Sequence, residues 1–319
     1  MMKTQCGIGY LKRLFFFNVF IGTLLTLVGS LAWAAPEGSP WGADYFPNIK
    51  LVDQDGKTVR FYDDLIKDKV VAINFIYTHC GDSCPLGTAS LRQVQKLLGD
   101  RVGKDIFFYS ISIDPKHDTP KVLKEYSERF RIGSGWRFLT GTKADTTLLR
   151  KKLGLFRDDV EAGKLSEHNT SFMIGNESTG QWMKRSPFDE PKVLAWLLGR
   201  SLSRVKSVQK AELVSYAGAK QLPKISLGED IFRSRCDACH SLGNEDGLGP
   251  GLLNVTDRRD RAWLARWIKA PDRLLAEKDP IATDLYNRYK KVLMPNLRLS
   301  DADVEALIDY MDAASKAAR

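Results

Sequence analysis

The pattern of apolar and polar positions divides this 319-residue chain into distinct parts. Residues 14–35 form one long apolar run, and residues 42–200 alternate β-branched, apolar runs with stretches of helical periodicity. Residues 226–319 begin and end with helix-like stretches. We therefore predict an N-terminal targeting segment (1–35) and two domains (42–200 and 226–319) joined by a linker at 201–225.

The middle part has the pattern of an α/β domain. Apolar runs at 69–78 and 105–113 predict buried strands, and Asp55-Gly56 predicts a hairpin before the first of them. A second hairpin is predicted around residues 177–180, and Gly199 is expected just past the end of the last helix. Helices are predicted from Pro85, from Pro120, over 143–153 and over 191–198. The order β–α–β–α–β–α–β–β–α fits a thioredoxin-like core.

The first 35 residues have the layout of a secretory signal. Lys12-Arg13 precede the apolar run, and Ala32-Trp33-Ala34 places small residues where a signal peptidase reads them. We expect an exported, periplasmic protein. The run is also long enough for an uncleaved membrane anchor, which stays open as an alternative that would bring membrane association. Cys6 precedes the run and is expected to be incidental.

The net charge of +9 is uneven along the chain. Residues 226–319 carry 15 Lys and Arg against 16 Asp and Glu, whereas residues 200–224 carry six against one. No basic stripe interleaves with aromatic residues and no nucleic-acid motif is present, so we expect no nucleic-acid partner. A basic linker close to an anionic membrane surface explains the excess.

Cys80 and Cys84 form the first of two close cysteine pairs. Cys80 follows a predicted buried strand, and Cys84 is expected at a helix start, where free N–H groups favour a thiolate. Two such thiols can form a disulfide or bind a soft cation such as Cu(I), and an added imidazole extends the site to Cu(II). His168, in a polar loop, is the candidate imidazole, although spacing alone also allows a structural role.

Three segments carry a family resemblance. NFIYTHCGDSCP (74–85), SISIDPKHDTP (110–120) and a histidine before the penultimate hairpin resemble the Sco/SenC family of copper-binding assembly proteins. The resemblance implies that Cys80, Cys84 and His168 bind copper, and that the copper-accepting subunit of a cytochrome oxidase is a partner. Glu167 and Asn169, which flank His168, depart from the family pattern. His79 is expected to tune the thiolate, with a ligand role as the less favoured alternative. His117 is expected to be solvated, and Asp82 to serve either copper charge balance or a turn.

Cys236, Cys239 and His240 form a C-x-x-C-H motif, the signature of covalent haem attachment in an exported chain. The rival interpretation, zinc, needs a second ligand pair that this region lacks. Met294, followed by Pro295, is the expected second axial ligand of the haem iron. Met311 has the spacing of a core residue on the last helix.

The region 226–319 resembles class I cytochromes c, an all-α fold. The resemblance rests on the haem motif, on Gly249-Pro250 and on a last helix that begins with a capping box at Ser300 and Asp303. It implies one covalent haem c and an electron-transfer partner protein. Phe232 and Tyr310 are expected at the contact of the first and last helices, and Trp263 and Trp267 against the haem.

The sequence is compatible with three functional classes to different degrees. The first is a copper chaperone for cytochrome oxidase assembly, and the second is a haem-linked thiol–disulfide oxidoreductase that acts without copper. The third, a thiol peroxidase, is disfavoured because such an enzyme needs one activated cysteine with its own surroundings, whereas this chain has a cysteine pair. Protein dithiols have reduction potentials of about −270 to −120 mV, and a His/Met haem is expected to lie well above this range. Electrons would therefore run from a dithiol to the haem. A disulfide nevertheless exchanges two electrons and a haem one. The Cu(II)/Cu(I) couple exchanges one electron, as the haem does. We therefore expect the haem to exchange electrons with the copper site.

Overall fold

The computed structural model describes residues 41–156, 169–203 and 224–318. The described residues form a seven-stranded mixed sheet flanked by helices, followed by a helical region that has its own apolar core. This arrangement confirms the predicted fold class, a thioredoxin-like α/β domain followed by an all-α cytochrome c domain.

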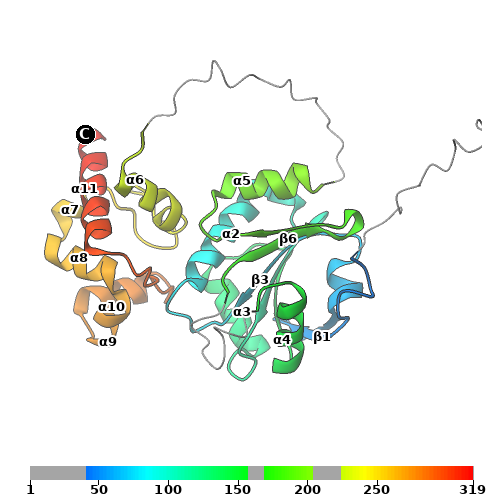
Figure 1. Ribbon diagram of the computed structural model, residues 1–319. Coiled ribbons are helices and arrows are strands. Elements are labelled where there is room, and N and C mark those ends of the chain that lie inside the picture. The colour runs from blue at the N-terminus through cyan, green and yellow to red at the C-terminus, as the bar shows by residue number, and fades with distance from the viewer. Residues whose placement is uncertain (1–40, 157–168, 204–223, 319) are drawn as a thin grey trace, which may run out of the picture. The chain divides into compact units, whose positions relative to one another are not determined.

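The sheet has the strand order β2-β1-β5-β4-β3-β6-β7 (Figure 1). Strands β3, β4 and β5 are parallel to one another, whereas β1–β2, β1–β5, β3–β6 and β6–β7 pair in antiparallel fashion. Both predicted hairpins are therefore present, as β1–β2 and β6–β7. The strands are β1 (Lys50–Asp53), β2 (Thr58–Arg60), β3 (Val70–Ile76), β4 (Ile106–Ser112), β5 (Trp136–Thr140), β6 (Phe172–Asn176) and β7 (Gln181–Arg185).

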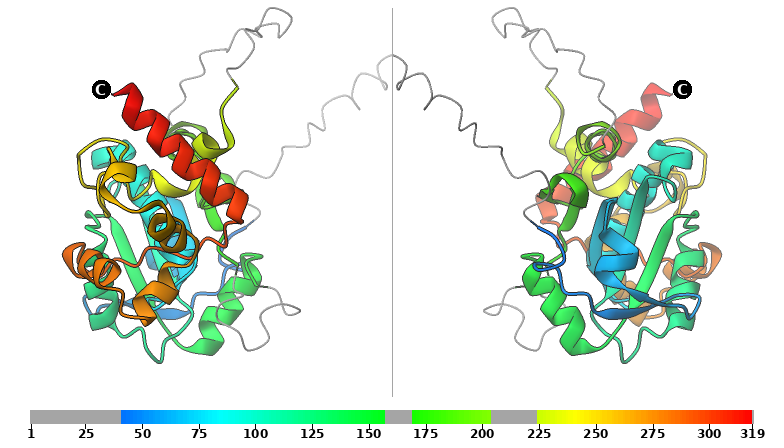
Figure 2. Two further views of the ribbon diagram at one scale, coloured as in Figure 1. Left: turned by 90° about the vertical axis from the view of Figure 1, so that its left-hand side faces the viewer. Right: turned by 90° about the vertical axis from the view of Figure 1, so that its right-hand side faces the viewer.

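Helices cover both faces of the sheet. Helices α2 and α5 lie over one face and α3 and α4 over the other, as the side views also show (Figures 1 and 2). Thr119 caps α3 by accepting a hydrogen bond from the Val122 N–H. The helices are α2 (Cys84–Leu98), α3 (Pro120–Arg129), α4 (Lys143–Lys152) and α5 (Pro191–Trp196), with short helical turns η1 (Phe61–Ile66), η2 (Gly99–Arg101), η4 (Glu177–Thr179) and η5 (Leu197–Ser201).

The parallel pairing of β3 and β4 determines where the functional loops lie. All seven residues of β3 are buried, as expected for a strand covered on both faces. The register runs from Val70 opposite Ile106 to Ile76 opposite Ser112, so the two strands end side by side. The loop that carries Cys80 and the loop that carries Asp114 therefore leave the same edge of the sheet.

The predicted helix end at Gly199 is wrong. Helix α5 continues directly into η5, and Gly199 lies buried within that turn. The Arg101 guanidinium donates a hydrogen bond to the Gly199 carbonyl, and a Cβ at this position would lie 3.0 Å from Leu98 Cδ2. Glycine serves here for close packing against α2 and η2, and not for a left-handed helix cap.

The C-terminal region is built around the packing of α6 against α11. The Phe232 and Tyr310 rings contact each other at a centroid distance of 5.9 Å, as predicted for this helix pair. Ser300 and Asp303 form the expected capping box at the start of α11. The helices are α6 (Leu227–Ile231), α7 (Val255–Arg258), α8 (Arg261–Lys269), α9 (Pro271–Ala276), α10 (Pro280–Arg288) and α11 (Asp301–Ala317), with the turn η7 (Phe232–Cys236).

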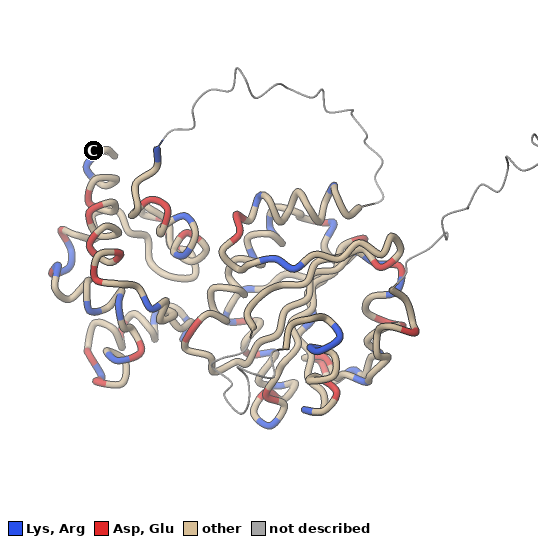
Figure 3. Tube along the Cα trace, in the orientation of Figure 1, with Lys and Arg blue, Asp and Glu red and all other residues tan. Residues whose placement is uncertain are grey.

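Charged residues of both signs are interspersed along the described chain (Figure 3). On α11 the acidic side chains meet basic partners: Arg261 binds Glu305 and Asp309, and Lys316 binds Asp312. Within residues 41–156, 169–203 and 224–318, no helix combines the length and the apolar character needed to cross a membrane.

Candidate functional site

The first candidate site lies where β3 ends and α2 begins. Cys80 is buried, and its backbone N–H donates to the Tyr77 carbonyl at 3.2 Å, which closes a turn directly after the strand. Cys84 is buried as well and is the first residue of α2. The Cys84 thiol donates a hydrogen bond to the Cys80 sulfur, so one soft cation can contact both sulfur atoms. The residues present therefore fit a thiolate-bound copper ion.

The two thiols differ in acidity. The hydrogen bond from Cys84 lowers the pKa of Cys80 to about 6, with help from the Tyr77 hydroxyl and from the backbone N–H groups of Asp82 and Cys84. Burial, followed by the interaction with Cys80, raises the pKa of Cys84 well above its usual value. Burial and the hydrogen bond to Cys80 likewise raise the pKa of Tyr77. Cys80 is therefore the thiolate and Cys84 the protonated partner.

This result corrects one expectation. From the sequence we expect the start of the helix to favour a thiolate at Cys84. In the structure the N–H group at the helix start points to Cys80 instead, while burial dominates at Cys84. The helix N-terminus thus stabilises an anion as expected, but the anion is the cysteine that precedes the helix.

A buried carboxylate joins the two loops at this edge of the sheet. Asp118 is fully buried and accepts hydrogen bonds from the Thr78 hydroxyl at 2.6 Å and from the Ser112 hydroxyl at 2.5 Å. Thr78 is two residues before Cys80, whereas Ser112 is the last residue of β4. Asp118 therefore holds the cysteine loop against the loop that follows β4.

A group of polar side chains that the sequence argument did not connect lies on these two loops. His79, Asp114 and His117 place their ligand atoms within 4.8 Å of one another. The sequence signal is limited to the two predicted buried strands (69–78 and 105–113) that precede the loops. Their parallel pairing, seen in the structure, places both loops at one edge of the sheet. His168 falls within residues 157–168, outside the described residues, so its role as a copper ligand stays a prediction.

The second candidate site contains the haem motif. Cys236 ends the turn η7, and its carbonyl accepts hydrogen bonds from the N–H groups of Cys239 at 3.0 Å and His240 at 2.9 Å. Burial raises the pKa of each of the two cysteines to about 12. Both are therefore protonated thiols, unlike Cys80.

His240 is oriented by its second ring nitrogen. Its Nδ1 lies 2.8 Å from the Pro250 carbonyl oxygen and donates to it, which leaves Nε2 available to a metal. Burial lowers the pKa of His240, so the imidazole is neutral and able to bind iron. A Cβ on Gly249 would lie 2.5 Å from His240 Cε1, so this position needs glycine.

A cavity of about 330 Å³ joins the predicted haem residues. Cys236, Cys239, His240 and Met294 all line it, whereas the rest of its wall is largely apolar. Trp263 and Trp267 stack with ring centroids 5.8 Å apart and also line the cavity, as expected. Further wall residues are Leu252, Leu264, Ile268, Leu285, Val292 and Leu307, together with the basic residues Arg258, Arg259 and Arg288.

The cavity fits a haem group. The apolar wall can pack against the porphyrin ring, and the arginines can pair with the two propionates. The His240 imidazole and the Met294 thioether are the ligand types of a cytochrome haem iron. Met311 is buried in the core of this region, as expected for a residue on α11. The assignment of Met294 as the axial ligand stays a prediction that its place in the cavity wall supports.

The fold and the two sites define a class: a thioredoxin-like domain with a dithiol at the start of a helix, followed by a cytochrome c domain. Residues 40–195 match the family model described as SCO1/SenC, and residues 225–315 match the model described as Cytochrome c. A SCO2-like protein of Rickettsia felis is 31% identical over 162 residues, which cover 48% of this chain and 75% of that relative. The chain belongs to the SCO1/SenC family and carries an additional cytochrome c domain.

Two further relatives cover the same domain. Protein SenC of Rhodobacter capsulatus is 35% identical over 136 residues, which cover 41% of this chain and 58% of that relative. Among solved structures, a SCO1/SenC family lipoprotein from Bacillus anthracis shares 28% identity with a TM-score of 0.43, and the match covers 52% of this chain and 98% of that one.

Proposed function

We propose that this protein is an exported copper chaperone with a built-in electron carrier. Cys80, Cys84 and His168 bind copper, and the copper-accepting subunit of a cytochrome oxidase receives it. The observation that carries the proposal is the contact between the Cys80 and Cys84 sulfurs, with Cys80 as a stabilised thiolate, in a domain of the SCO1/SenC family. Thiolate sulfur is the ligand type that selects Cu(I).

The haem group has a separate role in this proposal. Cys236 and Cys239 would hold haem c covalently, and His240 and Met294 would bind its iron. When bound, the haem supplies a one-electron couple. The chain's own residues orient the imidazole through Pro250 and exclude water with the apolar cavity wall. Copper also changes oxidation state by one electron, so electron exchange with the haem would set the oxidation state of the copper.

A copper titration tests the first part. Haem-loaded protein with reduced thiols is titrated with Cu(I) in the presence of a competing chelator, and compared with Cys84→Ser and His168→Ala. We expect tight one-to-one binding, lost in Cys84→Ser and weakened in His168→Ala. Ser83→Ala is the matched control, because the Ser83 side chain makes no capping hydrogen bond at the start of α2. Equal binding by Cys84→Ser and the unchanged protein would refute the copper site.

Stopped-flow spectroscopy tests the second part. Ferric, haem-loaded protein carrying Cu(I) should show reduction of the haem, and the same protein without copper but with reduced thiols should show much less. The absence of any haem redox change with copper present would refute electron exchange between the two cofactors.

The acidity of Cys80 favours a second candidate function, thiol–disulfide exchange. A thiolate of low pKa beside a protonated partner thiol is the arrangement of a dithiol oxidoreductase. In that case the pair would cycle between dithiol and disulfide with equal rates in the presence and absence of copper. Inhibition of the cycle by one equivalent of Cu(I) would assign the pair to copper instead.

A further inference from the structure

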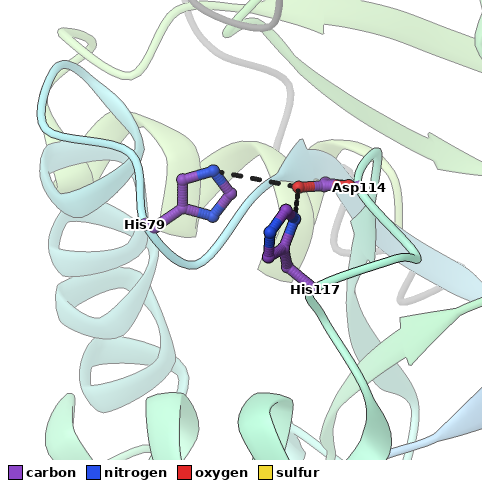
Figure 4. Close-up of side chains that lie close together, drawn as sticks. All are labelled: His79, Asp114 and His117. Atoms are coloured by element: carbon purple, nitrogen blue, oxygen red, sulfur yellow. Dashed lines mark hydrogen bonds and ion pairs between the residues drawn. The ribbon is translucent and has the colours of Figure 1, made fainter.

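Two histidines on neighbouring loops converge on one carboxylate oxygen. His117 Nδ1 lies 2.6 Å from Asp114 Oδ2, and His79 Nε2 lies 3.8 Å from the same atom. Figure 4 shows both imidazole rings beside the Asp114 carboxylate, although they come from different loops. The ring centroids of His79 and His117 are 5.1 Å apart. The three side chains thus present two nitrogens and one oxygen to a single point.

The distances suit a metal ion. Cu(II) prefers square-planar coordination by nitrogen and oxygen ligands, and two neighbouring ligands at about 2.0 Å in such a plane lie about 2.8 Å from each other. The observed separations of 2.6 and 3.8 Å bracket this value, so small side-chain rotations suffice. The imidazoles are free to make them, because the side chains of His79 and His117 are 52% and 64% exposed.

The backbone around the three residues is well anchored. The Asp114 N–H donates to the Ser112 hydroxyl at 3.0 Å, and the Asp114 carbonyl accepts from the N–H groups of His117 and Asp118. Asp118 in turn binds Thr78, the residue before His79. The same buried carboxylate therefore holds both loops that carry the ligands, and the ligand set is prearranged.

We propose that His79, Asp114 and His117 form a second metal site, which binds Cu(II) at the surface next to the loop that carries Cys80 and Cys84. Two imidazoles and a carboxylate prefer borderline divalent cations, among which Cu(II) binds most tightly. The set leaves at least one coordination position open, as transfer and exchange require. His79 precedes Cys80 directly. Its role as the place where copper arrives before it reaches Cys80 and Cys84 rests on the proposed function.

Metal titration of a thiol-free variant tests the site. Tag-free, haem-loaded Cys80→Ser/Cys84→Ser protein is titrated calorimetrically with Cu(II) and, separately, with Zn(II). We expect one equivalent to bind, with Cu(II) tighter than Zn(II). In the same background, His79→Gln/His117→Gln should weaken binding at least a hundredfold and Asp114→Asn at least tenfold. Lys121→Gln, an exposed change on α3 that touches none of the three ligands, is the matched control and should bind within twofold.

Several results would overturn the site. Unchanged binding in His79→Gln/His117→Gln would assign the metal to other groups, including His168, which is present in every variant. No binding in the thiol-free protein would refute the site outright. Electron paramagnetic resonance of the Cu(II) adduct gives a second readout, since hyperfine splitting from fewer than two nitrogens contradicts the ligand set. The changed histidines are exposed, so circular dichroism should show an unaltered fold.

The loading role is tested with the thiols present. On mixing with Cu(II), the thiolate-to-copper charge-transfer band should appear at least fivefold more slowly in His79→Gln/His117→Gln, while the final amplitude stays the same. Equal rates would refute the loading role even where the first experiment finds the site. Failure of the thiols to bind copper at all would refute the proposed function, while the calorimetric result for the surface site would still stand.

Discussion

The two cysteine pairs of this chain differ by one residue in spacing and far more in chemistry. Cys80 and Cys84 are separated by three residues between a strand and a helix. Cys80 is a thiolate because the Cys84 thiol and backbone N–H groups donate hydrogen bonds to it. Cys236 and Cys239 enclose two residues after a helical turn, and burial keeps both protonated. The first pair suits exchangeable binding of a metal, and the second suits permanent attachment of a cofactor. The surroundings, more than the spacing, separate the two roles.

The largest expected effect separates the pairs completely. Cys236→Ser/Cys239→Ser should yield protein without covalent haem when it is produced together with a haem-attachment system, because both thioether bonds are lost. Cys80→Ser/Cys84→Ser should retain full haem content. Haem staining after denaturing electrophoresis and the pyridine haemochrome spectrum measure both. Covalent haem in the first variant, or its loss in the second, would contradict the separate roles assigned to the two cysteine pairs.

The pH dependence of the thiolate should also distinguish the pairs. In reduced, copper-free protein the ultraviolet thiolate band should grow as the pH rises through about 6, below the ordinary cysteine value of 9.0, because Cys84 and Tyr77 donate to Cys80. The Cys80→Ser variant should lose this step, and Cys84→Ser should move it to higher pH. Cys236→Ser/Cys239→Ser is the control and should keep it.

The same shift has a consequence for stability. Since folding lowers the pKa of Cys80, its contribution to the free energy of unfolding is fully present above the unfolded value of 9.0. The contribution declines as the pH falls from there and is lost below about 6. Denaturant unfolding of Cys80→Ser should therefore show a weaker rise in stability between these two pH values than the unchanged reduced protein does.

Two methionines of the haem domain allow a matched test of the axial ligand. Met294→Ala should keep covalent haem but lose the methionine–iron absorption band, and its reduction potential should fall, because a thioether ligand raises the potential. Met311→Ala should keep the band and lower the free energy of unfolding by about 2–5 kcal/mol, since it leaves a cavity in a packed core. A lost band in Met311→Ala with an intact one in Met294→Ala would reverse the assignment.

Sequence reasoning succeeded where local rules decide the outcome. The hairpin at Asp55-Gly56, the Thr119 cap and the capping box at Ser300 depend on residues a few positions apart, and all are present. The interpretation of Gly199 as a helix end failed because its packing against Leu98 and Arg101 comes from distant parts of the chain.

The candidate sites show the same difference between features set by local sequence and features set by distant contacts. The haem motif is contiguous, and the residues predicted to hold the haem all line one cavity. The expected thiolate at Cys84 is not found because burial, which no local pattern reports, raises the pKa of that thiol. The meeting of His79 with Asp114 and His117 depends on the register of β3 and β4, which pairs Ile76 with Ser112. Only the three-dimensional arrangement of the sheet brings those side chains together.

The smallest expected effect concerns the cap of the last helix in the haem domain. The Ser300 hydroxyl accepts from the Asp303 N–H at 3.2 Å, and the Asp303 carboxylate accepts from the Ser300 N–H at 3.0 Å. Ser300→Ala removes one half of this box and should lower the free energy of unfolding by about 1 kcal/mol. Denaturant unfolding followed by haem absorbance measures it, and Lys316→Gln, a change in an exposed ion pair near the other end of α11, should cost less. The visible haem spectrum should be unchanged in both variants, because the cap stabilises the helix without contacting the haem cavity. An altered spectrum in Ser300→Ala alone would show that the start of α11 also positions the haem ligands.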